Sequence, residues 1–219
     1  MPRIIDLTFP IHSGMTTFAA PWHPFVEITQ LARHGLEGRE TRRIVMGTHS
    51  GTHCDAPLHF IPDGTTIDQI ALDVFIGPAV ICDFSRLAPS HAITADELAA
   101  AVGDRRADRI LLRYDWSDRI STRAFYTDHP YLEIGAAEWL VERGVKLLGM
   151  DAPMPDNPRD GQDSPNDSPV HKVLLGHGIV LVEYLCNLRA IPVRDFELIV
   201  LPLKLREGDG APARCVAIV

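Results

Sequence analysis

Four potential metal ligands, His49, His53, Asp55 and His59, lie within eleven consecutive positions of the sequence. Their imidazole nitrogens and carboxylate oxygens are donors that Zn²⁺, Mn²⁺ and Fe²⁺ accept. All four positions are odd-numbered, so an extended chain would direct the side chains to one face. A helix would scatter them, and the intervening glycine and proline oppose a helix. The segment therefore predicts a divalent-cation site on extended or turn-like backbone.

A complete site needs donors from other parts of the chain. Glu183 is a strong candidate, because a carboxylate within the apolar run IVLVEYLCNL needs a partner. His171 near the start of a short helix is another, and His177 ranks below it. Asp151 and Asp115 are further candidates. Hydrogen-bonded core histidines are the weaker interpretation of the cluster, because burying four such donors without a ligand leaves many polar atoms unpartnered.

The surrounding elements indicate an α/β protein. Apolar β-rich runs alternate with helical segments in the second half of the chain, which is typical of a curved, barrel-like mixed sheet flanked by a few helices. The 219 residues fit one domain spanning 1–219. The predicted strands are 3–11, 25–32, 40–47, 77–85, 107–115, 145–151, 179–188, 196–205 and 210–219, and the predicted helices are 94–103, 135–144 and 168–178.

Helix boundaries carry local signals. Thr94 and Glu97 form a capping-box pattern, and Gly103 marks the exit of that helix. Ser168 is expected to cap the last helix, with Pro169 at its first position. The polar, proline-rich stretch 151–169 is too long for an ordinary connection, so it is expected to be functional.

Composition narrows the class of protein. The net charge of −8 and the lack of a basic run argue against nucleic-acid binding. No apolar run approaches the roughly 18 residues of a membrane helix, and the first residues do not resemble a signal peptide. Four scattered cysteines fit free thiols in a reducing compartment. We therefore expect a cytoplasmic protein with a small-molecule substrate, and neither a nucleic-acid nor a membrane partner.

The pattern HxGTHxDxPxHF at residues 49–60 resembles the signature of the cyclase family of metal-dependent hydrolases. That family includes bacterial kynurenine formamidase and isatin hydrolase. The resemblance extends over nearly the whole chain, through RIIDLTFPIHSGM, LLRYDW, GMDAP and LPLKLREGDGAPARCVAI. It implies a swivelling β/β/α, cyclase-like fold and a homo-oligomer, a dimer or larger.

The resemblance also implies roles for individual residues. His49, His53 and Asp55 correspond to metal ligands, with the aspartate bridging two zinc ions in kynurenine formamidase. His171 and Glu183, twelve residues apart, correspond to the pair that completes the second metal. The isatin hydrolase site resembles a single manganese centre, so one or two ions, and Zn²⁺ or Mn²⁺, all remain open.

His59 corresponds to the residue that transfers protons, and a third-ligand role is its alternative. The resemblance implies hydrolysis of an amide-type C–N bond, in an aryl formamide such as N-formylkynurenine or in a cyclic amide, by metal-activated water. Phe18, Trp22 and Phe60 are expected to wall an aromatic substrate.

The chain departs from the formamidase pattern at two places. Tyr114-Asp115-Trp116 stands where formamidases usually carry Thr-Gly-Trp. Asp151-Ala152-Pro153-Met154 replaces their usual Asp-Thr-Pro-Ser. The lost hydroxyl groups change which substrate groups a pocket can bind.

Three alternative functions stay open. One is an isatin-hydrolase-like, manganese-dependent lactam hydrolase. A second is a non-haem iron oxygenase, in which Arg189 would serve the 2-oxoglutarate co-substrate, although that class leaves His49 and His59 without a role. The third is a metal-binding protein without catalytic activity.

Overall fold

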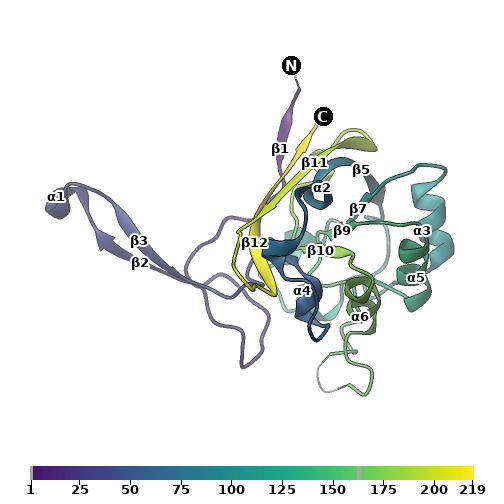
Figure 1. Cartoon of the computed structure of the whole chain (residues 1–219), viewed down its shortest axis with the longest axis horizontal. Coiled ribbons are helices and arrows are strands. Elements are labelled where there is room, and N and C mark those ends of the chain that lie inside the picture. Colours follow the sequence, from purple (N-terminus) through teal and green to yellow (C-terminus); the bar gives the residue numbers. More distant parts are fainter. Residues whose placement is uncertain (1, 162–163) are drawn as a thin grey trace.

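A mixed β-sheet of eight strands curves until β4 pairs with β12 as well as with β10, so that seven strands form a closed ring. The computed structural model describes residues 2–161 and 164–219, and Figure 1 shows β1 and the chain termini at one end of the sheet. The strands, in sheet order, are β1 (Ile4–Asp6), β12 (Gly210–Ile218), β11 (Asp195–Pro202), β5 (Ile76–Asp83), β7 (Arg109–Arg113), β9 (Leu147–Met150), β10 (Val180–Glu183) and β4 (His53–Asp55).

The centre of the sheet is parallel. Strands β5, β7, β9 and β10 run in the same direction, and every residue of β9 and β10 is buried. Parallel strands covered on both faces read as continuous apolar runs, which is why the sequence predicted them. The barrel-like α/β fold is confirmed. The predicted strand 3–11 is shorter than expected, because after β1 the chain makes only an isolated bridge between Thr8 and Leu185.

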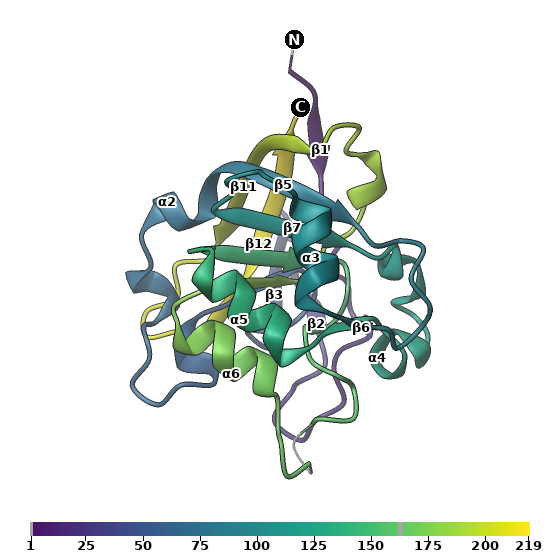
Figure 2. The ribbon, with the colours of Figure 1, turned by 90° about the vertical axis from the view of Figure 1, so that its right-hand side faces the viewer.

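Helices pack against the outer face of the ring. Figure 2 shows α3, α5 and α6 lying together in front of the strands. Residues that alternate along β7 divide between two cores: Ile110 and Leu112 face these helices, and Leu111 faces the interior of the ring. No described helix is long and apolar enough to cross a membrane. The helices are α1 (His34–Glu37), α2 (Leu72–Phe75), α3 (Ala95–Val102), α4 (Ala124–Thr127), α5 (Ile134–Glu142) and α6 (Pro169–Gly176).

One helix cap is as predicted and the other only in part. The Thr94 hydroxyl accepts the Glu97 backbone N–H at 3.2 Å, and the Glu97 carboxylate accepts the Thr94 N–H at 2.9 Å. Ser168 lies at the N-cap position and Pro169 begins the helix, as predicted, but the Ser168 side chain makes no capping bond. The Asp156 carboxylate, from the long loop, accepts the first free N–H groups of α6 instead.

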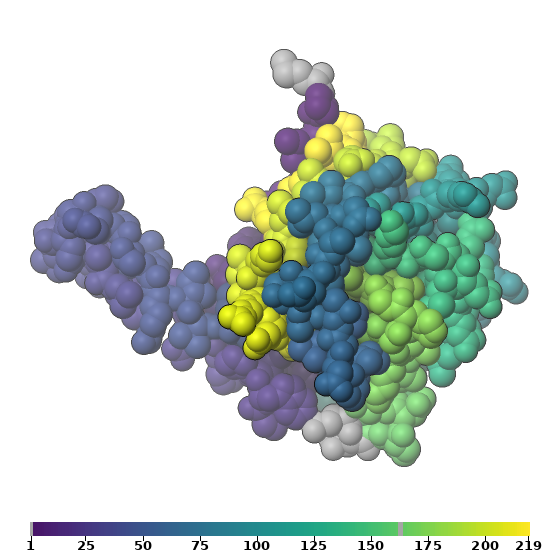
Figure 3. Space-filling model, in the orientation of Figure 1, coloured from purple at the N-terminus to yellow at the C-terminus, as the bar shows by residue number. Residues whose placement is uncertain are grey.

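A two-stranded arm projects from the body. β2 (Glu27–Ala32) and β3 (Thr41–Val45) pair antiparallel, and α1 lies at their tip. Figures 1 and 3 show the arm standing clear of the rest of the chain. A second small pair, β6 (Ala92–Ile93) with β8 (Tyr131–Leu132), is parallel. The sequence predicted both strands of the arm but not its projection.

The segment 49–59 is only partly extended. Of the four donors, His53 and Asp55 lie on β4, whereas His49 lies in a turn and His59 lies on a 3₁₀ turn (Pro57–His59). Gly51 permits the first turn, because its φ of 65° is in the left-handed region. Simple alternation therefore explains two of the four side chains, and turns bring in the other two.

Candidate metal centre

The site lies where β4 joins the two ends of the sheet. Register places His53 opposite Glu183 of β10, and Asp55 opposite Gly210 of β12. Gly210 is needed there, because a Cβ would lie 2.6 Å from the Cys54 carbonyl oxygen and 2.8 Å from the His49 ring. Closure of the ring thus brings residues about 130 to 160 positions apart into one cluster.

The His53 ring directs its second nitrogen, Nε2, into this cluster. Its Nδ1 lies 2.7 Å from the Gly51 carbonyl oxygen, which can only accept, so Nδ1 carries the proton and donates it. Nε2 then faces Asp55 Oδ1 at 3.2 Å and Glu183 Oε2 at 3.5 Å. A lone pair beside two carboxylates is repulsive unless a proton or a cation lies between them.

His171 of α6 repeats this arrangement from the opposite side. Its Nδ1 donates to Asp156 Oδ2 at 2.5 Å, and its Nε2 faces Glu183 Oε1 at 3.2 Å and Asp55 Oδ2 at 3.6 Å. Metal-binding histidines commonly donate their second N–H to a carboxylate or carbonyl group. His53 and His171 are held in this way by Gly51 and Asp156.

Three buried atoms of the cluster have no hydrogen-bond partner among the described residues: His53 Nε2, Asp55 Oδ2 and Glu183 Oε1. All three side chains are almost completely buried. Buried polar atoms of this kind are costly unless a ligand satisfies them. The donor set of two imidazoles and two carboxylates fits a divalent cation. Such a cation would provide a partner for all three unpartnered atoms.

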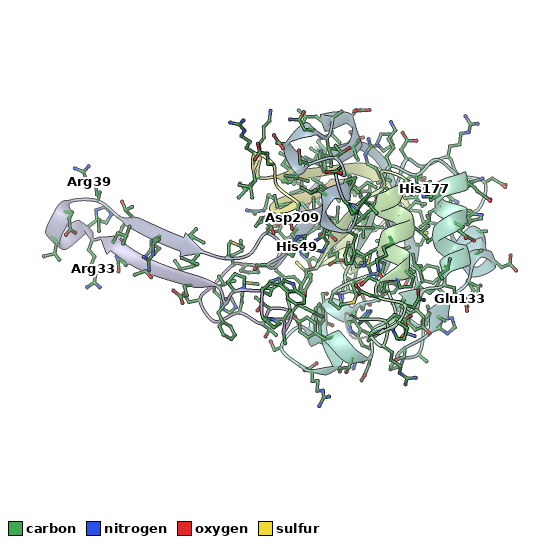
Figure 4. The ribbon with its side chains drawn as sticks, turned by 60° about the horizontal axis from the view of Figure 1, so that its bottom comes forward. Arg33, Arg39, His49, Glu133, His177 and Asp209 are labelled. Carbon is green, nitrogen blue, oxygen red and sulfur yellow. The ribbon has the colours of Figure 1, made fainter. Side chains whose placement is uncertain are left out.

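A second group of donors shares Asp55. His49 Nδ1 lies 2.7 Å from Asp55 Oδ1, and His49 Nε2 lies 2.7 Å from Asp209 Oδ2. The His59 ring stacks on His49 with centroids 3.8 Å apart, and its Nδ1 lies 3.6 Å from Asp209 Oδ2. Figure 4 shows His49 and Asp209 together at the base of the arm. Ligand atoms of His49, Asp55 and His59 lie within 4.8 Å of one another, as do those of His53, Asp55 and Glu183.

Electrostatics match this crowding of carboxylates and imidazoles. Burial lowers the pKa of His49, but Asp55 and Asp209 outweigh it and raise the pKa to about 10. Burial also opposes ionisation of Asp55, yet the surrounding histidines hold its pKa well below the usual value. Burial and the nearby Asp55 charge raise the pKa of Glu183. The cluster therefore binds extra positive charge strongly, as protons or as metal.

A cavity of about 510 Å³ opens beside the cluster. Phe18, Trp22 and Phe60, which the sequence assigned to a substrate wall, all line it. The Phe60 ring contacts those of His59 and His171, with centroids 4.5 and 4.6 Å away. The long loop also contributes to the wall, through Pro153, Met154, Pro158 and other residues.

Sequence reasoning missed several residues of the site. Asp156 and Asp209 hold histidines in place, and His23, Tyr126 and Tyr184 line the cavity. The two aspartates had only weak signals, namely a loop rich in acidic residues and an aspartate between two glycines before a strand.

Three candidate ligands lie outside both donor groups. The His177 ring is held by the Val173 carbonyl oxygen, Asp115 pairs with Arg113, and Asp151 accepts the Tyr114 N–H. Each side chain therefore has a partner of its own.

Comparison with known proteins agrees with this geometry. The family model named Cyclase matches residues 5–157. The chain is 32% identical over 212 residues to kynurenine formamidase of Bacillus cereus, covering 97% of this chain and 95% of that one. It is 37% identical over 179 residues to kynurenine formamidase of Salinibacter ruber, covering 78% and 76%. Isatin hydrolase A from Ralstonia solanacearum has a similar structure, with a TM-score of 0.89 and 28% identity over 100% and 92% of the two chains.

The fold and the donor set define a metal-dependent hydrolase. The chain belongs to the cyclase family, as its sequence motif predicted.

Proposed function

We propose that the protein hydrolyses an amide-type C–N bond of an aromatic substrate, either an aryl formamide such as N-formylkynurenine or a cyclic amide such as isatin. The observation that carries the proposal is the convergence of His53 Nε2 and His171 Nε2 on the Asp55 and Glu183 carboxylates. The relatives named kynurenine formamidase and isatin hydrolase support the bond type.

Five residues would hold the metal: His49, His53, Asp55, His171 and Glu183. Asp55 belongs to both donor groups, which suits a carboxylate that bridges two ions. His49 would bind through one ring nitrogen and keep the other N–H donated to a carboxylate. The mixed nitrogen and oxygen donors suit Zn²⁺ and Mn²⁺. A bound divalent cation would supply an activated water and polarise the carbonyl group.

His59 is assigned to proton transfer. When the C–N bond breaks, the water oxygen remains on the carbonyl carbon and the leaving nitrogen must gain a proton. The His59 ring lies at the cavity beside His49, and Asp209 Oδ2 near its Nδ1 fixes its orientation. Burial lowers the pKa of His59, so the ring is mostly unprotonated at neutral pH and can take a proton from the attacking water before it gives that proton to the leaving nitrogen.

The test is a reconstitution assay. Chelation with EDTA is expected to abolish hydrolysis of N-formylkynurenine, aryl formamides or isatin, and added Zn²⁺ or Mn²⁺ is expected to restore it. Full activity in protein shown by elemental analysis to be metal-free would contradict the proposal. Turnover that required oxygen and 2-oxoglutarate would favour the oxygenase alternative. However, Arg189 pairs with Asp115 and Asp118 and does not line the cavity.

Glu183→Gln is expected to lower the number of bound metal ions, because it removes a charge that faces both His53 and His171. Elemental analysis of the reconstituted variant against wild type measures the change. The surface variant Glu197→Gln, which replaces the same residue type away from the cavity, is the matched control. An unchanged metal content would contradict a ligand role for Glu183.

We also propose that the protein is a homo-oligomer assembled through the arm. Leu36 at its tip is 79% exposed, and Leu31 and Ile44 are also exposed. A two-stranded ribbon with this much exposed apolar surface is marginally stable alone in water. Four arginines lie in the arm within a chain of net charge −8, so a second copy offers complementary charge.

A shortened arm tests this assembly. Thr29 and Arg43 face each other in the ribbon, so an Asn-Gly turn can join them and replace residues 30–42. Light scattering after gel filtration is expected to show a dimer or larger for the full chain and a monomer for the shortened one. A full chain that is monomeric at micromolar concentration would contradict the proposal.

A further inference from the structure

Histidines and carboxylates lie together in the cavity wall. None of the described residues that line it is lysine or arginine. Three lining residues are acidic: Asp167, Glu183 and Asp209. The rest of the wall away from the cluster is mostly aromatic and apolar, as at Trp22 and Met154.

Two basic residues, Arg159 and Lys172, follow lining residues of the cavity in the sequence, but neither lines the cavity. Lys172 lies one turn into α6, and its Nζ contacts the Asp167 backbone carbonyl and lies 3.8 Å from the Asp167 carboxylate. Figure 4 shows Arg33 and Arg39 at the tip of the arm, away from His49 and Asp209. Among the described residues, no lysine or arginine therefore lines the cavity, where it could pair with an anionic group of a substrate.

An anionic substituent would be unfavourable in this cavity. It would exchange water for aromatic and apolar contacts without gaining a partner of opposite charge. Only the divalent cation itself would attract an anion, and that position is needed by the scissile carbonyl group.

We infer that the preferred substrate is an uncharged aromatic amide that carries no carboxylate beyond the bond to be cleaved. The inference rests on the proposed function and narrows it. It predicts that N-formylkynurenine, whose amino-acid end bears a carboxylate, is a poorer substrate than its carboxamide.

The test uses 3-formamidobenzamide and 3-formamidobenzoate, which have similar size and differ in charge. The kcat/KM of the metal-reconstituted protein is measured for each compound. Each value is divided by that compound's rate constant for hydrolysis by hydroxide, which removes the electronic effect of the substituent. The normalised kcat/KM of the benzoate is expected to be lower by about tenfold or more.

A charge introduced into the wall provides the matched control. Met154 lines the cavity and belongs to neither donor group. Met154→Lys is expected to raise the benzoate-to-benzamide ratio of kcat/KM by about tenfold. Met154→Gln adds polarity without charge and is expected to leave that ratio near the wild-type value.

The outcomes separate the inference from the function. Equal normalised values for the two compounds, or a preference for the benzoate, would overturn the inference and leave amide hydrolysis standing. A benzoate preference that disappears in the shortened-arm protein would overturn it too, and would assign the pairing cation to a second copy. No turnover of either compound would contradict the proposed function, and with it the inference.

Discussion

Asp55→Ala is expected to bind almost no metal and to have a kcat at least about a thousandfold below that of the wild-type protein. Asp55 is the one carboxylate shared by both donor groups. Its two oxygens lie 2.7 Å from His49 Nδ1, 3.2 Å from His53 Nε2 and 3.6 Å from His171 Nε2. The change would therefore remove a ligand from each proposed donor group and leave three imidazoles around a gap.

Elemental analysis and steady-state kinetics on the same preparation measure both effects. Asp55→Asn is the control for shape, since it keeps the size of the side chain and removes the charge; it is expected to lose metal as well. Circular dichroism checks that both variants remain folded, because β4 is also a structural strand. Full metal content in folded Asp55→Ala would refute the ligand role.

His59→Ala is expected to retain its metal and to lose about 10²- to 10⁴-fold of kcat. The His59 ring lines the cavity, with its Nδ1 3.6 Å from Asp209 Oδ2, and from there it can give a proton to a leaving nitrogen. A leaving group that needs no proton should depend less on this ring. The kcat of His59→Ala is therefore expected to fall much less for phenyl formate, which releases phenol, than for formanilide, which releases aniline.

The two substrates distinguish proton transfer from a general structural defect. An equal loss for ester and amide would contradict a role of His59 in leaving-group protonation. Loss of the metal from His59→Ala would instead identify His59 as a ligand, together with His49 and Asp55.

Local signals in the sequence predicted much of the fold. The capping box at Thr94 and the buried parallel strands depend on residues close in the chain, and both are present. Ser168 has the predicted N-cap position of α6, but the side chain that makes the capping bonds, Asp156, was not predicted because it lies in a loop whose path only the folded chain defines. Nothing in the sequence near the arm indicated that it projects.

The residues of the candidate site likewise divide into those that local sequence predicts and those that only the fold brings together. His53 and Asp55 were predictable from alternation along one strand. Glu183 could be singled out because a charge in an apolar run needs a partner, and it lies opposite His53 in the sheet. Asp209 escaped prediction because its relation to His49 exists only through the pairing of β4 with β12.

The pairing of β4 has a consequence for the lifetime of the fold. This strand of three residues is the seam that joins the two ends of the sheet, and it also carries two of the proposed ligands. A cation held by His53 and Asp55 of β4, Glu183 of β10 and His171 of α6 would connect these three elements directly. Because ligands that bind only the folded state stabilise it, metal depletion is expected to loosen the barrel at this joint first. A shortage of metal would then shorten the lifetime of the folded protein in addition to abolishing its hydrolytic activity.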